Sequence, residues 1–385
     1  MFSFFRSAST RRLVLALSSV LAVLVLGVAI AVAASSSGPV PPPKPLAAAL
    51  HDALAGPRVA GVTARIQFTN RLVESSSVPQ GSPLLQSGSG RLWASQDGRV
   101  RLELQSERGD AEILWDGTNL TVFDATSNTV YKLAVPGKAS AETSQGGPSI
   151  PGVAAIERML DRLAGDANVS GAIPSNVAGR EAYTVRVAPK HDGGLLGSVE
   201  LAWDAANATP LRAALYAAGN PSPVLELAAT EIAYGPVEAG VFSISVPSGA
   251  SVVDLSSPSA SRVGRAGVTV MSAVQSELPF KVAAPATLAG LPRREVRLAS
   301  VNSAKAATVV YGEGLGGIAV LETASSSSSE AKGLESLPAV SINGSTGHEL
   351  ATAIGTVVTF RRGGVQYTVI GSVPPAAAEA AARAL

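Results

Sequence analysis

Along residues 90–135, apolar side chains recur at every second position, and Asp-Gly pairs and short polar clusters interrupt the alternation. Successive side chains of a strand point to opposite faces, so Val100, Leu102 and Leu104 share one face and the charged residues between them share the other. The Asp-Gly pairs suit two-residue hairpin turns, in which glycine adopts positive φ. The pattern therefore predicts an antiparallel meander with one apolar face, which another part of the chain must cover.

The clearest helical pattern is at residues 151–165, where apolar residues recur at spacings of three and four. Charged residues occupy the opposite side of this predicted helix. Its apolar side is formed by Val153, Ile156, Leu160 and Leu163, with Met159 beside them. We expect this helix to cover the apolar face of the meander.

Other alternating segments predict that the meander belongs to a larger, mostly antiparallel sheet of about nine or ten strands, which must curl because strands twist. A short helix is expected ahead of the first strand, at Leu46–Ala55, with an apolar stripe of Leu46, Leu50 and Leu54. The remaining strands are predicted at Val59–Leu72, Ala182–Val187, Gly197–Asp204, Pro210–Ala217, Val224–Tyr234 and Val241–Val246.

A Ser-, Val- and Ala-rich stretch at residues 256–277 predicts a linker between a first domain, 46–255, and a smaller second domain, 278–385. The second domain ends in a helix opened by prolines, Pro374–Leu385. Its strands are predicted at Arg294–Ser300, Ala306–Tyr311, Ile318–Thr323, Thr356–Arg361 and Gln366–Ser372. Strands dominate both domains and only a few helices interrupt them, so the expected fold class is α+β.

Residues 13–34 carry no charge; arginines precede them and a Ser- and Pro-rich spacer, 35–45, follows. At ~1.5 Å per residue, a helix of this length crosses the ~30 Å apolar core of a bilayer. Residues 1–34 are therefore expected to be a cytoplasmic N-terminus and a membrane anchor, with the body of the chain outside the cytoplasm. The small residues at 31–33 leave open a cleaved signal peptide and a secreted protein.

The composition limits both the core and the chemistry. Hydrophobic residues make up 46% of the 385 residues and aromatic residues 4%, so burial must come mainly from Ala, Val, Leu and Ile. A net charge of +1 offers nothing that attracts nucleic acid. Without cysteine, the chain has no disulfide, thiol nucleophile or acylated lipobox cysteine.

Candidate catalytic and metal-binding groups are sparse. The histidines, His51, His191 and His348, are far apart, and none has a second ligand at metal-binding spacing. Residues 312–317 match G-x-G-x-x-G, but a strand-like segment follows where a dinucleotide site needs a helix, so we expect a hairpin. The acids at 103–112 fit a solvated sheet face better than a catalytic pair. We expect no enzyme activity, no cofactor and no metal site.

Several short segments of the first domain carry a family resemblance. They are Gly90-Arg91-Leu92, Arg99 to Leu102, Asp116-Gly117-Thr118, Val122-Phe123-Asp124, Asn128 to Tyr131, Leu201 to Asp204, Pro210-Leu211-Arg212 and Val241 to Gly249. With them, residues 46–255 resemble the LolA/RseB-like group of exported, lipid-binding half-barrels, which includes lipoprotein carriers and regulators of anti-sigma factors. The resemblance implies an open, strongly curved antiparallel sheet that helices close around a hydrophobic cavity.

Residues 278–385 look similar to a small extracytoplasmic domain of unknown function, which implies no activity. The excess of Arg over Lys and the abundance of Ala are typical of a GC-rich, actinobacterial source.

The resemblance implies binding of a lipid, an acyl chain or a similar hydrophobic ligand, which we expect to rest on apolar burial alone. The predicted anchor at residues 13–34 makes the expected protein membrane-tethered, unlike the soluble carriers of the group. The alternative is an extracytoplasmic sensor or regulator that binds an anti-sigma factor or another envelope partner. A hydrolase of envelope polymers is least favoured, because no triad or carboxylate pair can be nominated. The three tryptophans either pack in the core or line the cavity. We expect the cavity to be lined by Leu102, Leu104, Ile113, Trp115, Leu120, Val122, Ile156, Met159, Leu160, Leu163 and Trp203.

Overall fold

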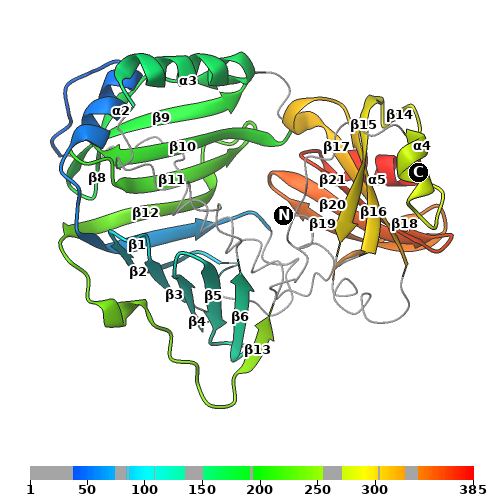
Figure 1. Ribbon diagram of the computed structural model, residues 1–385, viewed down its shortest axis with the longest axis horizontal. Coiled ribbons are helices and arrows are strands. Elements are labelled where there is room, and N and C mark those ends of the chain that lie inside the picture. Colours follow the sequence, from blue (N-terminus) through cyan, green and yellow to red (C-terminus); the bar gives the residue numbers. More distant parts are fainter. Residues whose placement is uncertain are drawn as a thin grey trace.

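The computed structural model describes residues 38–73, 84, 86–107, 109–134, 151–190, 194–254, 271–301, 304–325 and 337–385. Within them the chain forms a 13-stranded sheet and an 8-stranded sheet, called here the large sheet and the small sheet. The large sheet is strongly curved, with two helices at one end, and the small sheet lies beside it (Figure 1). The predicted α+β class, with a curved and mostly antiparallel sheet, is confirmed.

The large sheet runs in the order β13-β6-β5-β4-β3-β2-β1-β12-β11-β10-β9-β7, and β8 pairs with β9 off this path. Among its described strand pairs, only β13 and β6 are parallel. The strands are β1 (Gly61–Asn70), β2 (Gly88–Ser95), β3 (Val100–Ser106), β4 (Gly109–Trp115), β5 (Asn119–Asp124), β6 (Thr129–Ala134), β7 (Ala167–Val169), β8 (Ile173–Val177), β9 (Arg180–Pro189), β10 (Leu196–Asp204), β11 (Pro210–Ala217), β12 (Pro223–Tyr234) and β13 (Ser251–Asp254). The short strands β7, β8 and β13 are absent from the sequence prediction.

The predicted meander is confirmed as β2 to β6, in which each strand is antiparallel to the next. Its Asp-Gly turns form as expected, with φ of 87° at Gly98 and 102° at Gly117. Val100, Leu102 and Leu104 are buried together on one face of β3, as the alternation predicts. We call the face of the large sheet that carries these three side chains the inner face, and the opposite face the outer face.

Helix α2 (Leu46–Ala55) has the predicted bounds and covers the inner face of β9 to β11. Its buried side differs from the predicted leucine stripe, since Leu54 is 46% exposed. The fully buried residues of the helix are Ala47, Ala49 and Ala53. Ala49 and Ala53 let the helix lie close to the bulky Tyr183 and Trp203 of the sheet, and Leu46 and Leu50 pack at the edge of this contact, only partly buried.

The prediction that the second helix covers the meander is wrong. This helix, α3 (Val153–Asp166), contacts α2 and β7, which lie at the end of the large sheet away from β3 to β6. The chain passes from α3 directly into β7, whose pairing with β9 fixes the helix at that end. Ile156 is buried as predicted, but Met159 is 62% exposed and Leu163 is 38% exposed.

Residues 241–246 are not the predicted last strand. They begin in a short 3₁₀ helix, η4 (Ala239–Phe242), and continue as irregular chain. Arg101 of β3 donates hydrogen bonds to the carbonyls of Val241 and Ser243, both at 2.9 Å. The Arg101 side chain thus binds two carbonyls that would bond to a neighbouring strand if this segment were a strand. The last strand of the large sheet along the chain is β13.

The small sheet runs in the order β14-β15-β16-β17-β21-β20-β19-β18. All five predicted strands are present, whereas β14, β18 and β19 are absent from the prediction. The elements are α4 (Met271–Ser276), β14 (Thr287–Leu288), β15 (Leu291–Val301), β16 (Ala304–Tyr311), η5 (Gly314–Gly316), β17 (Ile318–Ala324), β18 (Ala339–Ile342), β19 (Ser345–Thr352), β20 (Gly355–Arg362), β21 (Val365–Gly371) and α5 (Pro375–Arg383). Helix α4 lies within the predicted linker, and its Val274 is buried in the core of the small sheet.

The predicted hairpin at the glycine-rich residues 312–317 is confirmed. The segment joins β16 to β17, which pair antiparallel. A dinucleotide-binding turn would lead into a helix there, and the chain instead leads into a strand.

Backbone hydrogen bonds join the two sheets at two places. The Ala353 N–H, between β19 and β20, donates to the Leu72 carbonyl at 2.8 Å. The next residue, Ile354, packs against the apolar core on the inner face of the large sheet. At the second place, the Leu195 N–H donates to the Ser372 carbonyl at 2.8 Å. The second half of the chain therefore supplies part of the cover that the meander needs.

The predicted anchor or signal peptide, residues 1–34, lies outside the described residues. In the part of the chain that the structure describes, no helix is both long and apolar enough to cross a membrane.

Candidate functional site

The inner face of the large sheet is hollow near its centre. A cavity of about 510 Å³ lies there, and it is open to solvent at one end. Its walls come mainly from the central strands β1, β2, β11 and β12. The apolar side chains of the wall are Val59, Val62, Ala64, Ile66, Leu92, Ala94, Val100, Leu211, Ala213, Leu227, Ala229 and Ile232.

Small inward-facing side chains explain the hollow. Ala64 pairs with Leu92 across one strand boundary and with Ile232 across the other, and Ala213 pairs with Leu227. Protein interiors are otherwise packed as densely as organic crystals, so alanine at several neighbouring inward positions leaves volume that no other side chain fills. The walls of the cavity are therefore formed by strand residues whose side chains are too short to fill the space between them.

The inner face is filled on both sides of this hollow. Towards β9, α2 covers a cluster that contains Trp203 and Tyr183, whose ring centroids are 6.1 Å apart. Towards the meander, a second cluster is built around Leu102, Leu104 and Val122. The hollow lies where the cover supplied by α2 ends and the meander core begins.

The mouth of the cavity is polar. The polar residues Arg58, Ser95, Gln96, Asn207 and Thr209 line it there, because β1 begins, β2 ends and β11 begins at this end of the sheet. Along β1, the distance from Gly61 at the mouth to Ile66 inside is about 16 Å, at ~3.3 Å per residue. The cavity therefore combines a polar entrance with an apolar interior.

Six of the eleven residues predicted from the sequence to line a cavity lie together. Leu102, Leu104, Ile113, Leu120 and Val122 are buried in one cluster on the inner face, and Trp115 packs against it. They adjoin the cavity but are not among the residues that line it. Their contact with a ligand stays a prediction.

The other five predicted residues lie elsewhere. Ile156, Met159, Leu160 and Leu163 are on α3, beside α2 and β7. Trp203 does face inward, but α2 covers it, and it is only 2% exposed. The structure thus does not bring the helix residues to the meander residues.

The residues that do line the cavity are not among those predicted from the sequence. One signal was present: the inward positions of β1 alternate Val62, Ala64 and Ile66 with polar residues, so a small side chain sits between two large ones. Placing that alanine beside Ala94 and Ala229 requires the register of strands that are distant along the chain, which alternation alone does not supply.

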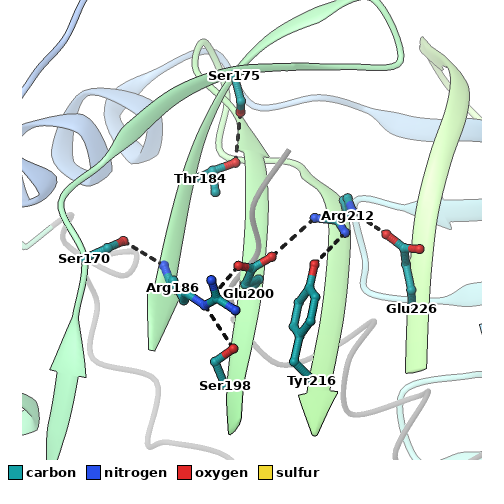
Figure 2. Close-up of polar contacts among 9 residues, drawn as sticks. All are labelled: Ser170, Ser175, Thr184, Arg186, Ser198, Glu200, Arg212, Tyr216 and Glu226. Atoms are coloured by element: carbon teal, nitrogen blue, oxygen red, sulfur yellow. Dashed lines mark hydrogen bonds and ion pairs between the residues drawn. The ribbon is translucent and has the colours of Figure 1, made fainter. Parts of the chain in front are cut away.

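A polar cluster lies on the outer face of β9 to β12 (Figure 2). Arg212 Nε donates to Glu226, and its Nη2 donates to the Tyr216 hydroxyl at 3.1 Å. Arg186 Nε lies 3.2 Å from a carboxylate oxygen of Glu200, which is buried. The two arginines and two glutamates compensate one another, and the cluster joins four strands without a histidine.

The predicted acidic face of the meander is likewise structural. Arg101 Nη2 lies 2.8 Å from Glu103 and 2.9 Å from Glu112. Within the described residues, no group of three or more His, Asp or Glu side chains could hold a metal ion.

No protein-family model and no curated protein sequence matches this chain. Solved structures similar to it include MucB in complex with MucA(peri), with 17% identity, a TM-score of 0.37, and coverage of 88% of this chain and 94% of that chain. A LolA superfamily protein from Nitrosomonas europaea has 12% identity and a TM-score of 0.23, and the match covers 52% of this chain and 98% of that chain. A putative outer membrane lipoprotein-sorting protein domain from Vibrio parahaemolyticus has 10% identity and a TM-score of 0.21, covering 48% and 89%. One of these neighbours is described as a LolA superfamily protein, the superfamily named in the resemblance of residues 46–255.

Proposed function

We propose that this chain is a non-catalytic, extracytoplasmic binding protein that holds an acyl chain or a similar hydrophobic ligand in the inner-face cavity. The observation that carries the proposal is the cavity itself, whose 510 Å³ falls within the ~300–1,000 Å³ typical of small-molecule sites. Its interior offers aliphatic side chains and its mouth offers polar ones, which matches the two ends of an amphiphile.

Apolar burial alone supplies enough free energy for binding. Each buried CH₂ contributes ~0.8 kcal/mol, so roughly ten methylene groups contribute about 8 kcal/mol before the cost of association. The cavity is already open, so the ligand need not create it.

The lining residues also support a binding role over catalysis. None of the described residues that line the cavity is a histidine or an acid. General acid–base chemistry needs such a group within hydrogen-bond reach of the substrate. The proposal places no bond-making step at this site.

The extracytoplasmic location rests on the sequence of residues 13–34, which we propose to be a membrane anchor. The spacer at 35–45 would then lead from the membrane to the large sheet, where the carbonyls of Pro39 and Pro42 accept hydrogen bonds from the side chains of Asn176 and Tyr183.

The experiment is lipid extraction from the full chain purified from native membranes, followed by mass spectrometry. A stoichiometric acyl-containing species is expected from the parent protein. The variant Ala229→Leu places a larger side chain in the cavity and should lose most of it. Ala228→Leu is the matched control, because Ala228 lies on the outer face of the same strand, paired with Arg212. The proposal fails if the parent carries no lipid, or if both variants retain it equally.

A second candidate is a regulator that binds an envelope protein such as an anti-sigma factor. The contact of Ile354 with the inner-face core favours it, because the small sheet touches the face on which the ligand would bind. Crosslinking in native membranes should then recover one membrane protein partner, with a yield that changes when lipid is added. A yield that ignores lipid would count against it.

A further inference from the structure

The cavity has an uneven charge distribution. Among the described residues that line it, two are arginines, Arg58 and Arg212, and none is acidic. A cavity with low-dielectric walls and one sign of charge at its edge attracts ligands of the opposite sign.

The two arginines differ in their partners. The Arg212 guanidinium is engaged on the outer face by Glu226 and Tyr216, with Glu200 3.7 Å away (Figure 2). Arg58 is exposed, and it makes no hydrogen bond or ion pair with any residue that the structure describes. The charge at the mouth is therefore uncompensated within the described chain.

The acidic side chains closest along the chain to the mouth residues are already paired. Asp97, beside Gln96, pairs with Arg99 at 2.8 Å. Asp204, in the turn before Thr209, pairs with Arg180 at 2.8 Å and accepts a hydrogen bond from the Tyr234 hydroxyl at 2.6 Å. Neither carboxylate is left to neutralise Arg58.

The position of Arg58 suits a headgroup. It lies between α2 and β1, just ahead of Gly61, where the apolar wall of Val62, Ala64 and Ile66 begins. A chain lying along β1 with one end at Ile66 has its other end at this arginine. Guanidinium binds carboxylate and phosphate oxygens through two parallel hydrogen bonds.

We propose that the ligand of the cavity is an amphiphile with an anionic headgroup, a carboxylate or a phosphate, that pairs with Arg58 while its acyl chain fills the apolar interior. This inference rests on the proposed binding function and adds the class of ligand to it. Arg58 is a specificity residue in this assignment, and the apolar wall supplies most of the affinity.

The test uses the full chain in nanodiscs of zwitterionic lipid, with radiolabelled dodecanoate, dodecyl phosphate and dodecanol as probes. Dodecanol has the same chain without the charge. Arg58→Gln should weaken binding of the two anions about tenfold, which is the loss of one charge-assisted contact, and should leave dodecanol unchanged. Comparing variants with the parent cancels partition of each probe into the nanodisc.

Two further variants separate charge from structure. Arg58→Lys keeps the positive charge but cannot form the two parallel hydrogen bonds of a guanidinium, so it should retain part of the preference for anions. Arg71→Gln removes an equal charge at the other end of β1, where Arg71 is exposed, and should change nothing. Dodecyl phosphate and dodecanoate distinguish the two possible headgroups. The probe that binds more tightly identifies the headgroup class, phosphate or carboxylate, that the site prefers.

The outcomes of the test are distinguishable. If all three probes bind the parent equally, or if Arg58→Gln weakens dodecanol as much as dodecanoate, the anionic ligand is refuted and the binding function stands. If no probe binds the parent, both proposals fail. Salt provides an independent check, because screening should reduce the anion preference of the parent and not that of Arg58→Gln.

Discussion

In the small sheet, Phe360 and Tyr367 stack with ring centroids 5.0 Å apart, and α5 lays Ala378 and Ala381 against the same core. In the large sheet, alanines face inward at the centre and line the cavity. The small sheet has one large buried cluster around its helices and a separate small one of Ala306 and Leu321, whereas the inner face of the large sheet is divided into two sizeable clusters.

The two sheets differ in packing because the helices cover a larger share of the small sheet than of the large sheet. A short helix such as α5 can close much of an eight-stranded sheet, because α4 and the segment after it fill the remainder. The ten-residue α2 covers only β9 to β11 of a thirteen-stranded sheet. The same alternation of apolar and polar residues thus produces a closed core in one sheet and a hollow in the other.

The largest expected effect is in the filled part of the large sheet. Trp203→Ala should lower the free energy of unfolding by about 3–5 kcal/mol, because it removes a buried ring beneath α2 and leaves a void. Urea unfolding followed by circular dichroism measures the loss. Trp93→Ala is the control, since Trp93 lies on the outer face and is only half-buried, with the Arg101 guanidinium 5.9 Å from its ring. Equal losses in the two variants would show that α2 does not close a packed core.

The packed core of the small sheet contains one buried carboxyl group, which destabilises the fold when it is ionised. Glu322 is fully buried between Ala307 and Tyr367 on the neighbouring strands, and burial raises its pKa to about 7, while a hydrogen bond from the Ala283 N–H lowers it. The ordinary glutamate pKa is 4.5, so the folded state holds the proton more tightly than the unfolded state. The stability linked to this proton is complete below about pH 4.5 and is lost as the pH rises through about 7.

Glu322→Gln should therefore remove this pH dependence. At pH 9 the small sheet of the variant should be more stable than that of the parent by up to about 3 kcal/mol, and near pH 4.5 the two should agree. Hydrogen exchange of peptides from β17 and β21 is the measurement, because all three tryptophans lie in the large sheet. Glu313→Gln, at an exposed carboxylate paired with Arg294, is the matched control and should show no such change. A pH profile shared by parent and Glu322→Gln would contradict the assignment.

Sequence reasoning succeeded where structure is decided locally. The bounds of the strand Pro210–Ala217 and of the helix Leu46–Ala55 are those predicted, because alternation and helical spacing are read within a few residues. The hairpin turns at Gly98 and Gly117 were predictable for the same reason: glycine reaches positive φ without a steric penalty.

It failed where the partner of an element is distant in sequence. Amphipathic spacing shows that α3 has an apolar side, but its docking beside β7 depends on the connection that follows it. The hollow needs Ala64, Ala213 and Ala229 on one face, and these residues belong to three strands whose mutual register is non-local. The chain carries many alanines, and only the fold shows which of them meet.

A larger side chain placed in the core of the small sheet tests whether that core has free volume. Ala378 of α5 is completely buried, so Ala378→Leu should lower the free energy of unfolding by about 1–3 kcal/mol. Ala376→Leu on the exposed side of the same helix is the control and should be near neutral. Hydrogen exchange of peptides from β20 and β21, which contact α5, reports the loss. A neutral Ala378→Leu would show free volume there and would erase the contrast between the sheets.

The smallest effect is expected in the hollow. Ala229→Leu adds three carbons where the cavity has room, so the free energy of unfolding should change by less than about 1 kcal/mol, in either direction. The reason is that no neighbouring side chain must move to admit the larger one, in contrast to Ala378→Leu. Parallel urea titrations of the two variants, each against the parent, give the difference directly. If Ala229→Leu is as destabilising as Ala378→Leu, the centre of the inner face is already packed, and the space that a ligand needs is absent.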